Sequence, residues 1–135
     1  MLKSFNDVTD FMERQHIASF ATVDVNRKPH VVPVWFTHDD GKVFVQTDRN
    51  SVKVRNIKKN SNVAIAIYSA EEAVIIRGEG RVIEDQGKFG RRTQQHVEKH
   101  NLKLDEQGRD SMGIPLYNSR IQCVVEVTPK KVMFW

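Results

Sequence analysis

The stretch from residue 47 to residue 57 gathers hydroxyl and basic side chains that together could bind a phosphate group. An alternating apolar strand pattern ends at Thr47, and Ser51 is typical of a helix N-cap, so a strand leads almost directly into a helix. The first N–H groups of a helix lack partners and lie at the positive end of its dipole, which favours an anion. Thr47 and Ser51 add hydroxyl donors, and Lys53 and Arg55 add positive charge. A capped surface helix with solvated lysines explains the same residues equally well.

A second segment, His30 to Phe36, could meet a flat ring. Pro33 cannot donate a ladder hydrogen bond, so its strand should lie at a sheet edge or be interrupted, which leaves backbone groups free for a ligand. Trp35 and Phe36 could pack on a heterocycle. The alternative is that both aromatic side chains belong to the core.

Hydrophobic periodicity predicts the elements that position these residues. Gly78 and Gly80 suggest a bulge or bend that lets a sheet curl, and Pro129 separates the last two strands. The polar stretch 101–118 is read as a surface loop. Six or seven strands with a few short helices predict a mainly β fold, an antiparallel barrel formed by a single domain, 1–135. Helices are expected over residues 4–15, 52–59 and 87–100, and strands over 17–24, 30–36, 42–47, 63–68, 73–83, 119–128 and 131–135.

Composition fits one globular domain of 135 residues, with 39% hydrophobic and 28% charged residues. No apolar run approaches the roughly 20 residues that span a bilayer, and the N-terminus turns acidic at Asp7, so we expect a cytoplasmic protein and no membrane partner. The formal charge of +4 permits an anionic ligand without naming one. The single cysteine, Cys123, lies in an apolar stretch and is read as a buried thiol.

Several classes of site are not supported by any motif. The sequence has no phosphate loop of the Gly-Lys-Ser type, no Gly-rich dinucleotide fingerprint and no Ser-His-Asp order. His96 and His100 have the i, i+4 spacing by which two histidines on a helix share a metal, but no third ligand is evident. We therefore expect no metal site and no catalytic dyad.

Two predicted strands are apolar on both faces, at residues 63–67 and 74–76. Strands that are buried on both faces need a cover on each side. The pattern favours a homodimer, in which a partner subunit covers one face.

The order of these segments resembles the pyridoxamine 5'-phosphate oxidase-like, FMN-binding split-barrel family. The likeness covers roughly residues 9–85 and, more loosely, the closing strand 124–135. It rests on an ordered set of segments, namely Ile17–Asp24, Lys28–Phe36, Gly41–Thr47, Ser51–Lys53 and Arg55–Ile57.

The resemblance implies a dimeric split barrel with two cofactor sites at the subunit interface. The cofactor would be FMN or, as in short members of the family, the deazaflavin coenzyme F-420. Lys53, Ser51 and Thr47 would hold its phosphate, and the backbone around Val34 and Trp35 would line its rings. Further candidates for cofactor contacts follow from position on the adjoining elements: His30, Gln46, Arg55, Arg77 and Trp135.

The implied activity is that of a flavin- or deazaflavin-dependent oxidoreductase acting on a small organic molecule. No acid–base residues are needed, because a flavin ring carries the hydride chemistry itself. The vitamin-processing oxidases of the family are longer and carry more basic residues on the second strand, where this chain has only His30, so we expect a different substrate. A non-catalytic flavin-binding or haem-handling module is the alternative. A third reading, a barrel that binds nucleic acid through phosphate contacts and aromatic stacking, is the least favoured.

Overall fold

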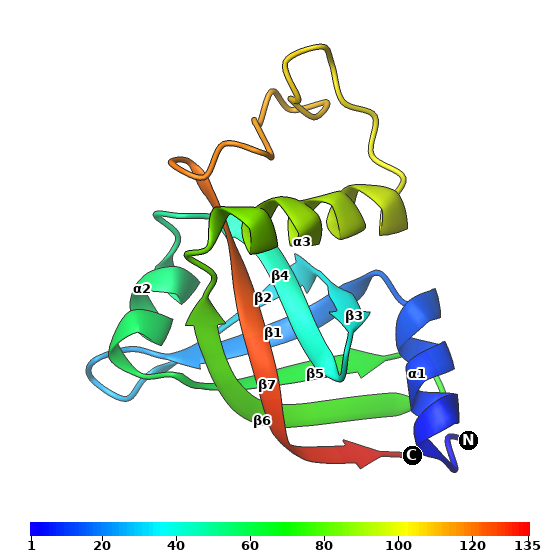
Figure 1. Cartoon of the computed structure of the whole chain (residues 1–135). Coiled ribbons are helices and arrows are strands. Elements are labelled where there is room, and N and C mark those ends of the chain that lie inside the picture. Colours follow the sequence, from blue (N-terminus) through cyan, green and yellow to red (C-terminus); the bar gives the residue numbers. More distant parts are fainter.

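The computed structural model describes the whole chain, residues 1–135, as one curled antiparallel sheet with three helices (Figure 1). The seven strands confirm the predicted mainly β, split-barrel fold class. In chain order the elements are α1 (Phe5–Arg14), β1 (Ile17–Val23), β2 (Pro29–Trp35), β3 (Thr37–Asp39), β4 (Lys42–Asp48), α2 (Val52–Lys59), β5 (Asn62–Tyr68), β6 (Ala73–Val82), α3 (Gln86–Lys99) and β7 (Gln122–Phe134).

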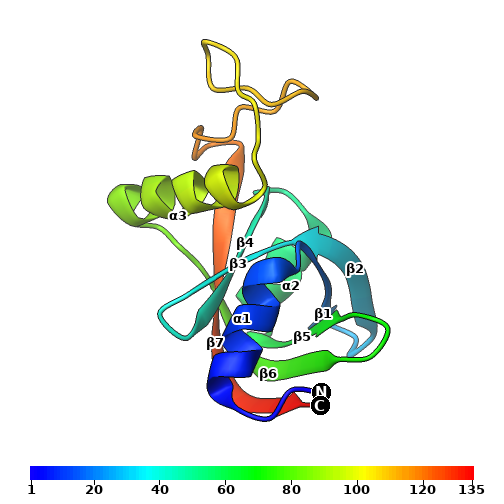
Figure 2. The same ribbon diagram turned by 90° about the vertical axis from the view of Figure 1, so that its right-hand side faces the viewer.

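The two edge strands of the sheet follow each other in the chain. The strand order is β2-β1-β5-β6-β7-β4-β3, so β2 and β3 form the edges. Only Phe36 separates them, and this link forces the sheet to curl until its edges meet at one corner. Figure 2 shows the strands curving in this way, with α1 in front of them. Pro33 lies on the edge strand β2, which confirms the position expected from its missing N–H group.

A single apolar interior holds the curled sheet and α1 together. Alternate residues of β6 point inward, so Val74 and Ile76 are buried while Arg77 is exposed. Helix α1 begins at an N-cap whose side chain, Ser4 Oγ, accepts a hydrogen bond from the Asp7 N–H at 3.1 Å. Its apolar face completes the core with Val8, Phe11 and Met12, all of which are buried.

The prediction that Pro129 separates two strands is wrong, because β7 runs without interruption from Gln122 to Phe134. Pro129 pairs with Gly78, while Lys131 pairs with Arg77, so Lys130 is the extra residue of a bulge. A bulge leaves one residue unpaired, which accommodates a proline inside a strand. The bend expected at the two glycines is confirmed at the same place.

Two further differences separate the sequence prediction from the structure. The three-residue strand β3 was not predicted, because it is too short to show an alternating pattern. The long connection after α3 lacks helices and strands, as expected, but part of it lines a cavity. None of the three helices has both the length and the apolar composition that crossing a bilayer requires.

Replacing Gly78 with alanine should destabilise the fold. A Cβ at this position would overlap the Thr128 carbonyl oxygen and lie 3.1 Å from the Pro129 Cα, so backbone must move. We expect a loss of about 1–3 kcal/mol in the free energy of unfolding, measured by urea denaturation. Gly90→Ala, at an open position in α3, is the control and should leave stability unchanged or slightly raised. Equal stability of Gly78→Ala and the wild type would contradict the role of the bulge.

Candidate functional site

Helix α2 is fixed to the barrel so that its N-terminus lies directly after β4. Asp48 forms the turn between them, because its Oδ1 accepts a hydrogen bond from the Asn50 N–H at 2.7 Å and its carbonyl accepts one from the Ser51 N–H at 3.1 Å. The buried Asn56 side chain donates to Thr22 Oγ1 at 3.0 Å, which holds the helix on β1. Val54 packs in the core. The barrel therefore determines where the first turn of α2 lies.

Two polar side chains at this helix start have no partner within the chain. Lys53 is half-buried and forms no ion pair, and its burial lowers the pKa of its ammonium group. Ser51 is the N-cap residue, yet its hydroxyl makes no capping hydrogen bond and its Oγ is buried without any partner. Unpartnered polar groups are uncommon in folded proteins and call for an explanation. An anion at this helix start would satisfy both groups, so the residues fit the phosphate of a flavin cofactor.

A cavity of about 720 Å³ opens beside Lys53. Its walls come from the end of β2, the end of β4, the helix α3 and the connection that follows it. A volume of this size is in the range that holds cofactors and small ligands. Five of the predicted site residues line this one cavity, namely Val34, Trp35, Gln46, Thr47 and Lys53.

The other predicted site residues do not line the cavity. Arg55 lies two positions after Lys53 on α2, which turns it by about 200° to the exposed side of the helix. His30 is at the far end of β2, opposite Thr22. Ser51 stands next to the cavity at the helix start. Arg77 is exposed on β6, and Trp135 pairs with the Ala73 backbone beyond the end of β7.

Gln46 joins three elements around the cavity. Its side-chain NH₂ donates to the Leu116 carbonyl at 2.9 Å and to Gln122 Oε1 at 3.3 Å. Its Oε1 accepts a hydrogen bond from the Thr93 hydroxyl of α3 at 3.0 Å. Both hydrogens of the amide are thus used by the protein. In this structure Gln46 holds α3 and the following connection in place.

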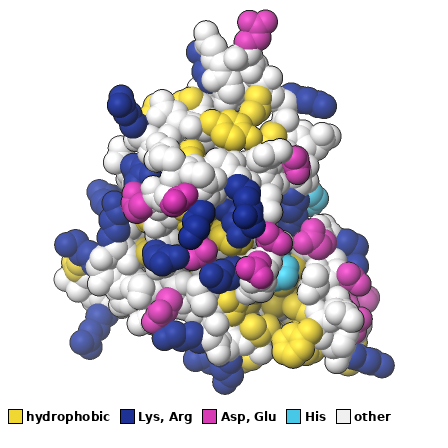
Figure 3. Space-filling model, viewed as in Figure 1, with side chains coloured by type: hydrophobic (Ala, Val, Ile, Leu, Met, Phe, Trp, Pro, Cys, Tyr) yellow, Lys and Arg dark blue, Asp and Glu magenta, His cyan; other side chains and the backbone are white.

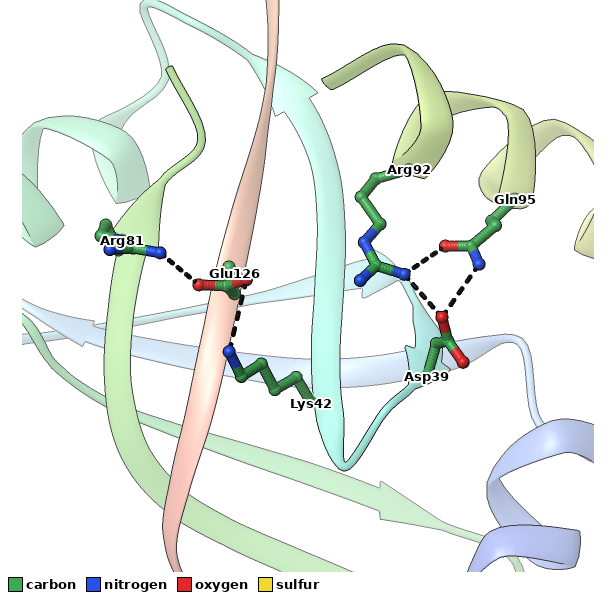
Figure 4. A network of polar contacts seen from close by, with 6 residues as sticks. All are labelled: Asp39, Lys42, Arg81, Arg92, Gln95 and Glu126. Carbon is green, nitrogen blue, oxygen red and sulfur yellow. Dashed lines mark hydrogen bonds and ion pairs between the residues drawn. The ribbon is translucent and has the colours of Figure 1, made fainter. Parts of the chain in front are cut away.

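The cavity-facing helix α3 is seated by cation contacts with the barrel (Figure 4). Arg92 pairs with Asp39 at 2.6 Å, and the hydrogen bond from Arg92 lowers the pKa of that carboxyl. The Arg92 guanidinium also lies 4.0 Å from the centre of the Phe44 ring. Nearer the helix C-terminus, Lys99 Nζ lies 3.9 Å from the centre of the Phe36 ring and donates to the Met12 carbonyl at 3.0 Å. The helix is therefore held to the barrel at its middle and near its C-terminus.

Charges are mixed around this site. On the face that carries α3, basic and acidic side chains are interspersed, with hydrophobic side chains exposed above and below them (Figure 3). Inside the cavity, Lys53 and Lys103 are balanced by Asp48 and Asp110. Selection of an anion must therefore come from the local geometry at Lys53 and not from the net charge.

Sequence reasoning missed the part of the cavity that lies between α3 and β7. Residues 101–116 supply about half of the lining, and His96 adds the α3 wall. The connection looked like an exposed loop because its residues are polar and follow no period. A signal for His96 was present, because Phe89, Thr93 and His96 follow the spacing of one helix face, and all three are buried.

The paired histidines do not form a metal centre. No group of three or more His, Cys, Asp or Glu side chains is arranged to hold a metal ion. Both ring nitrogens of His100 already have partners, since Nε2 lies 3.0 Å from the Phe36 carbonyl oxygen and Nδ1 lies 3.0 Å from Nδ1 of His16.

Comparison with solved structures supports the fold. The protein Rv2991 from Mycobacterium tuberculosis has a TM-score of 0.83 at 16% identity, and the alignment covers 100% of this chain and 86% of that one. An F420 reductase gives 0.73 at 20% identity, covering 92% and 94% of the two chains. The heme storage protein HutZ from Vibrio cholerae gives 0.77 at 15% identity, covering 99% and 94%. At these identities the likeness establishes the fold alone.

Comparison of the sequence identifies the family. No functionally curated protein matches the chain. The family model described as pyridoxamine 5'-phosphate oxidase matches residues 6–135, nearly the full length. The chain therefore belongs to the pyridoxamine 5'-phosphate oxidase family.

Proposed function

We propose that this protein is an FMN-dependent oxidoreductase that acts on a small organic molecule in the cavity beside Lys53. One observation carries the proposal. A half-buried ammonium group without a carboxylate partner lies at a helix start, on the wall of the same cavity that exposes the indole of Trp35. A ligand with an anionic end and a flat ring system matches this pair.

The roles of the residues follow from their positions. Lys53, the Thr47 hydroxyl and the first N–H groups of α2 would bind the phosphate. The Ser51 hydroxyl would join them by rotating about its Cα–Cβ bond, because its Oγ is buried and has no hydrogen-bond partner. The backbone of Val34 and the side chain of Trp35 would lie against the rings. When bound, the flavin ring system supplies hydride transfer.

The connection between α3 and β7 would exclude water from the reacting groups. Its apolar residues Met112, Ile114 and Leu116 line the cavity opposite the barrel wall. The Asp110 carboxylate shapes this part of the connection, since Oδ1 accepts hydrogen bonds from the N–H groups of Met112 and Ile114, both at 2.9 Å. The wall is thus a defined turn fixed by its own hydrogen bonds.

We also propose that a second copy of the chain covers β2. The outward side of this edge strand consists of apolar residues, and Val31 and Trp35 are 60% and 44% exposed. Ile121, at the cavity wall, is likewise exposed. Several exposed apolar side chains on one edge strand and the adjoining cavity wall are typical of an interface. Because Trp35 and Ile121 also line the cavity, the second copy would cover the cofactor as well.

Two other cofactors have a specific similarity in their favour. The likeness to an F420 reductase favours a deazaflavin as the alternative to FMN. The likeness to the heme storage protein HutZ favours a haem-handling module without turnover. The same cavity would serve in either case, and one experiment distinguishes them.

The identity of the cofactor is tested by purifying the protein and analysing what it retains. We expect a yellow protein whose released chromophore has the mass of FMN, and whose bound chromophore is reduced by a nicotinamide donor and reoxidised by an organic acceptor. If the released chromophore has the mass of a deazaflavin, the cofactor is the deazaflavin and not FMN. A haem spectrum, or a bound flavin that no donor reduces, would contradict the proposed oxidoreductase.

Lys53→Ala should weaken cofactor binding, because it removes the charge that faces the phosphate. We expect a loss of about 1.5–3 kcal/mol in binding free energy, the usual range for a hydrogen bond to a charged group, measured by fluorescence titration. Lys59→Ala removes the same charge from an exposed position of the same helix and should leave affinity unchanged. Equal affinities of the two variants would remove Lys53 from the site.

Ser51→Ala should affect the liganded and unliganded states differently. The hydroxyl makes no hydrogen bond in the unliganded chain, so its removal should not lower the melting temperature. Cofactor affinity should fall about five- to tenfold, because one hydrogen bond to the phosphate is lost. Ser4→Ala is the opposite control. It removes a cap that is formed, so stability should fall by about 1 kcal/mol while cofactor affinity stays unchanged. A drop in the melting temperature of Ser51→Ala without a change in affinity would refute this role.

A further inference from the structure

His96 occupies a position in the cavity that the cofactor contacts leave unused. It lies on the inward face of α3, is only 7% exposed, and borders the cavity on the wall formed by the helix. Its Nδ1 is buried without a hydrogen-bond partner. Because Nδ1 is buried, a ligand in the cavity would have to contact the imidazole at its other nitrogen, Nε2.

The ring of His96 is held in place by its neighbours. Its centre lies 4.8 Å from that of His100, in an edge-to-face arrangement, and 6.2 Å from that of Trp35. The helix that carries it is fixed by the Arg92–Asp39 ion pair (Figure 4). Lys99, over the Phe36 ring, holds the helix further along. The position of this imidazole is therefore defined before any ligand enters.

His100, one helical turn further on, cannot serve the same purpose. Its Nε2 must donate to the Phe36 carbonyl, so its Nδ1 carries the lone pair that accepts a hydrogen bond from Nδ1 of His16. Both nitrogens are thus used inside the chain. His96 is the histidine of this pair that has a nitrogen left for a ligand.

The protonation of His96 follows from its burial. Burial lowers its pKa to about 4, so the ring is neutral at neutral pH, although the negative charge of Asp110 acts in the opposite direction. A neutral imidazole has one N–H group and one lone pair. The buried Nδ1 has no acceptor nearby, and a buried N–H group without an acceptor is costly. The favoured tautomer therefore has the lone pair on Nδ1. The hydrogen then lies on Nε2, the nitrogen left to face the cavity.

Several apolar side chains stand among the polar ones that line the cavity with this donor. Leu102, Met112, Ile114 and Leu116 line the same cavity. The nearby Asp110 accepts two backbone hydrogen bonds through its Oδ1. A flat apolar compound with a single oxygen acceptor matches such a wall, because its rings meet hydrocarbon and its oxygen meets one N–H group.

We propose that His96 donates a hydrogen bond from Nε2 to a carbonyl-type oxygen of the compound that exchanges hydride with the cofactor. This inference rests on the proposed function and names the substrate class of the same cavity. That class is a flat, largely apolar carbonyl compound. His96 is a binding residue for the second reactant, and Lys53 is the binding residue for the cofactor.

The test uses two probes of the same shape, acetylnaphthalene and ethylnaphthalene, of which only the first has a carbonyl oxygen. Each is titrated calorimetrically into the cofactor-loaded protein. His96→Leu should weaken binding of acetylnaphthalene about tenfold, the value of one hydrogen bond, and leave ethylnaphthalene binding unchanged. His96→Gln, which keeps an N–H donor, should restore most of the loss. His38→Leu, a partly buried histidine outside this cavity, is the control and should change neither affinity.

The outcomes separate this inference from the proposed function. Equal losses for both probes would show that His96 only fills space, and no loss, or no binding of acetylnaphthalene to the wild type, would also overturn the inference. Cofactor affinity is measured for every variant, and we expect it unchanged in His96→Leu. If the wild type retains no cofactor, the titrations are carried out on the cofactor-free protein. A selective loss for acetylnaphthalene would then support the contact at His96 while the proposed function fails.

Discussion

The site depends on one half-buried charge, the Lys53 ammonium group, which the fold holds at a helix start without an ion-pair partner, although Asp48 lines the same cavity. Leaving a half-buried amine unpaired costs stability, and natural proteins retain such a cost mainly where a ligand offsets it. The barrel enforces the arrangement. The buried Asn56–Thr22 hydrogen bond and the core packing of Val54 and Ile57 fix α2, so the backbone of Lys53 is held at the cavity wall by core contacts.

The opposite wall of the cavity is built from residues that are far from Lys53 in the chain. Gln46 uses its whole amide to connect β4, α3 and the connection that follows α3, and Arg92 and Lys99 bind α3 to aromatic rings of the barrel. The cavity is therefore a consequence of tertiary contacts between polar groups. Hydrogen bonds and cation contacts fix its shape together with the apolar cluster that Phe89 of α3 forms with Phe44, Ile83 and Val124.

This division explains how much of the molecule was predictable from the sequence. Strands and α2 are local patterns of apolar residues, caps and turns, and apart from β3 and the division of β7 their bounds were predicted to within a few residues. The structure brings Lys53, Thr47 and Trp35 together in one cavity lining, because the segments that carry them end at neighbouring places on the barrel. The wall formed by residues 101–116 was not predictable, since polar long-range contacts leave no period in the sequence, whereas the helical spacing of Phe89, Thr93 and His96 did indicate that His96 points inward. Pro129 was misread because its tolerance depends on a bulge opposite Gly78, which only strand pairing reveals.

Burial has opposite chemical results at the two walls of the cavity. It lowers the pKa of both Lys53 and His96. The ordinary pKa of the ammonium group is 10.5, far above neutral pH. The ordinary pKa of the imidazole is 6.5, and burial lowers it to about 4, so the ring is neutral at neutral pH. One physical cause therefore yields a cationic group for an anion on one wall and an uncharged hydrogen-bond donor on the other. A cavity with this asymmetry can orient two different reactants without any residue changing its protonation state, as expected where the bound cofactor performs the chemistry and the protein supplies position.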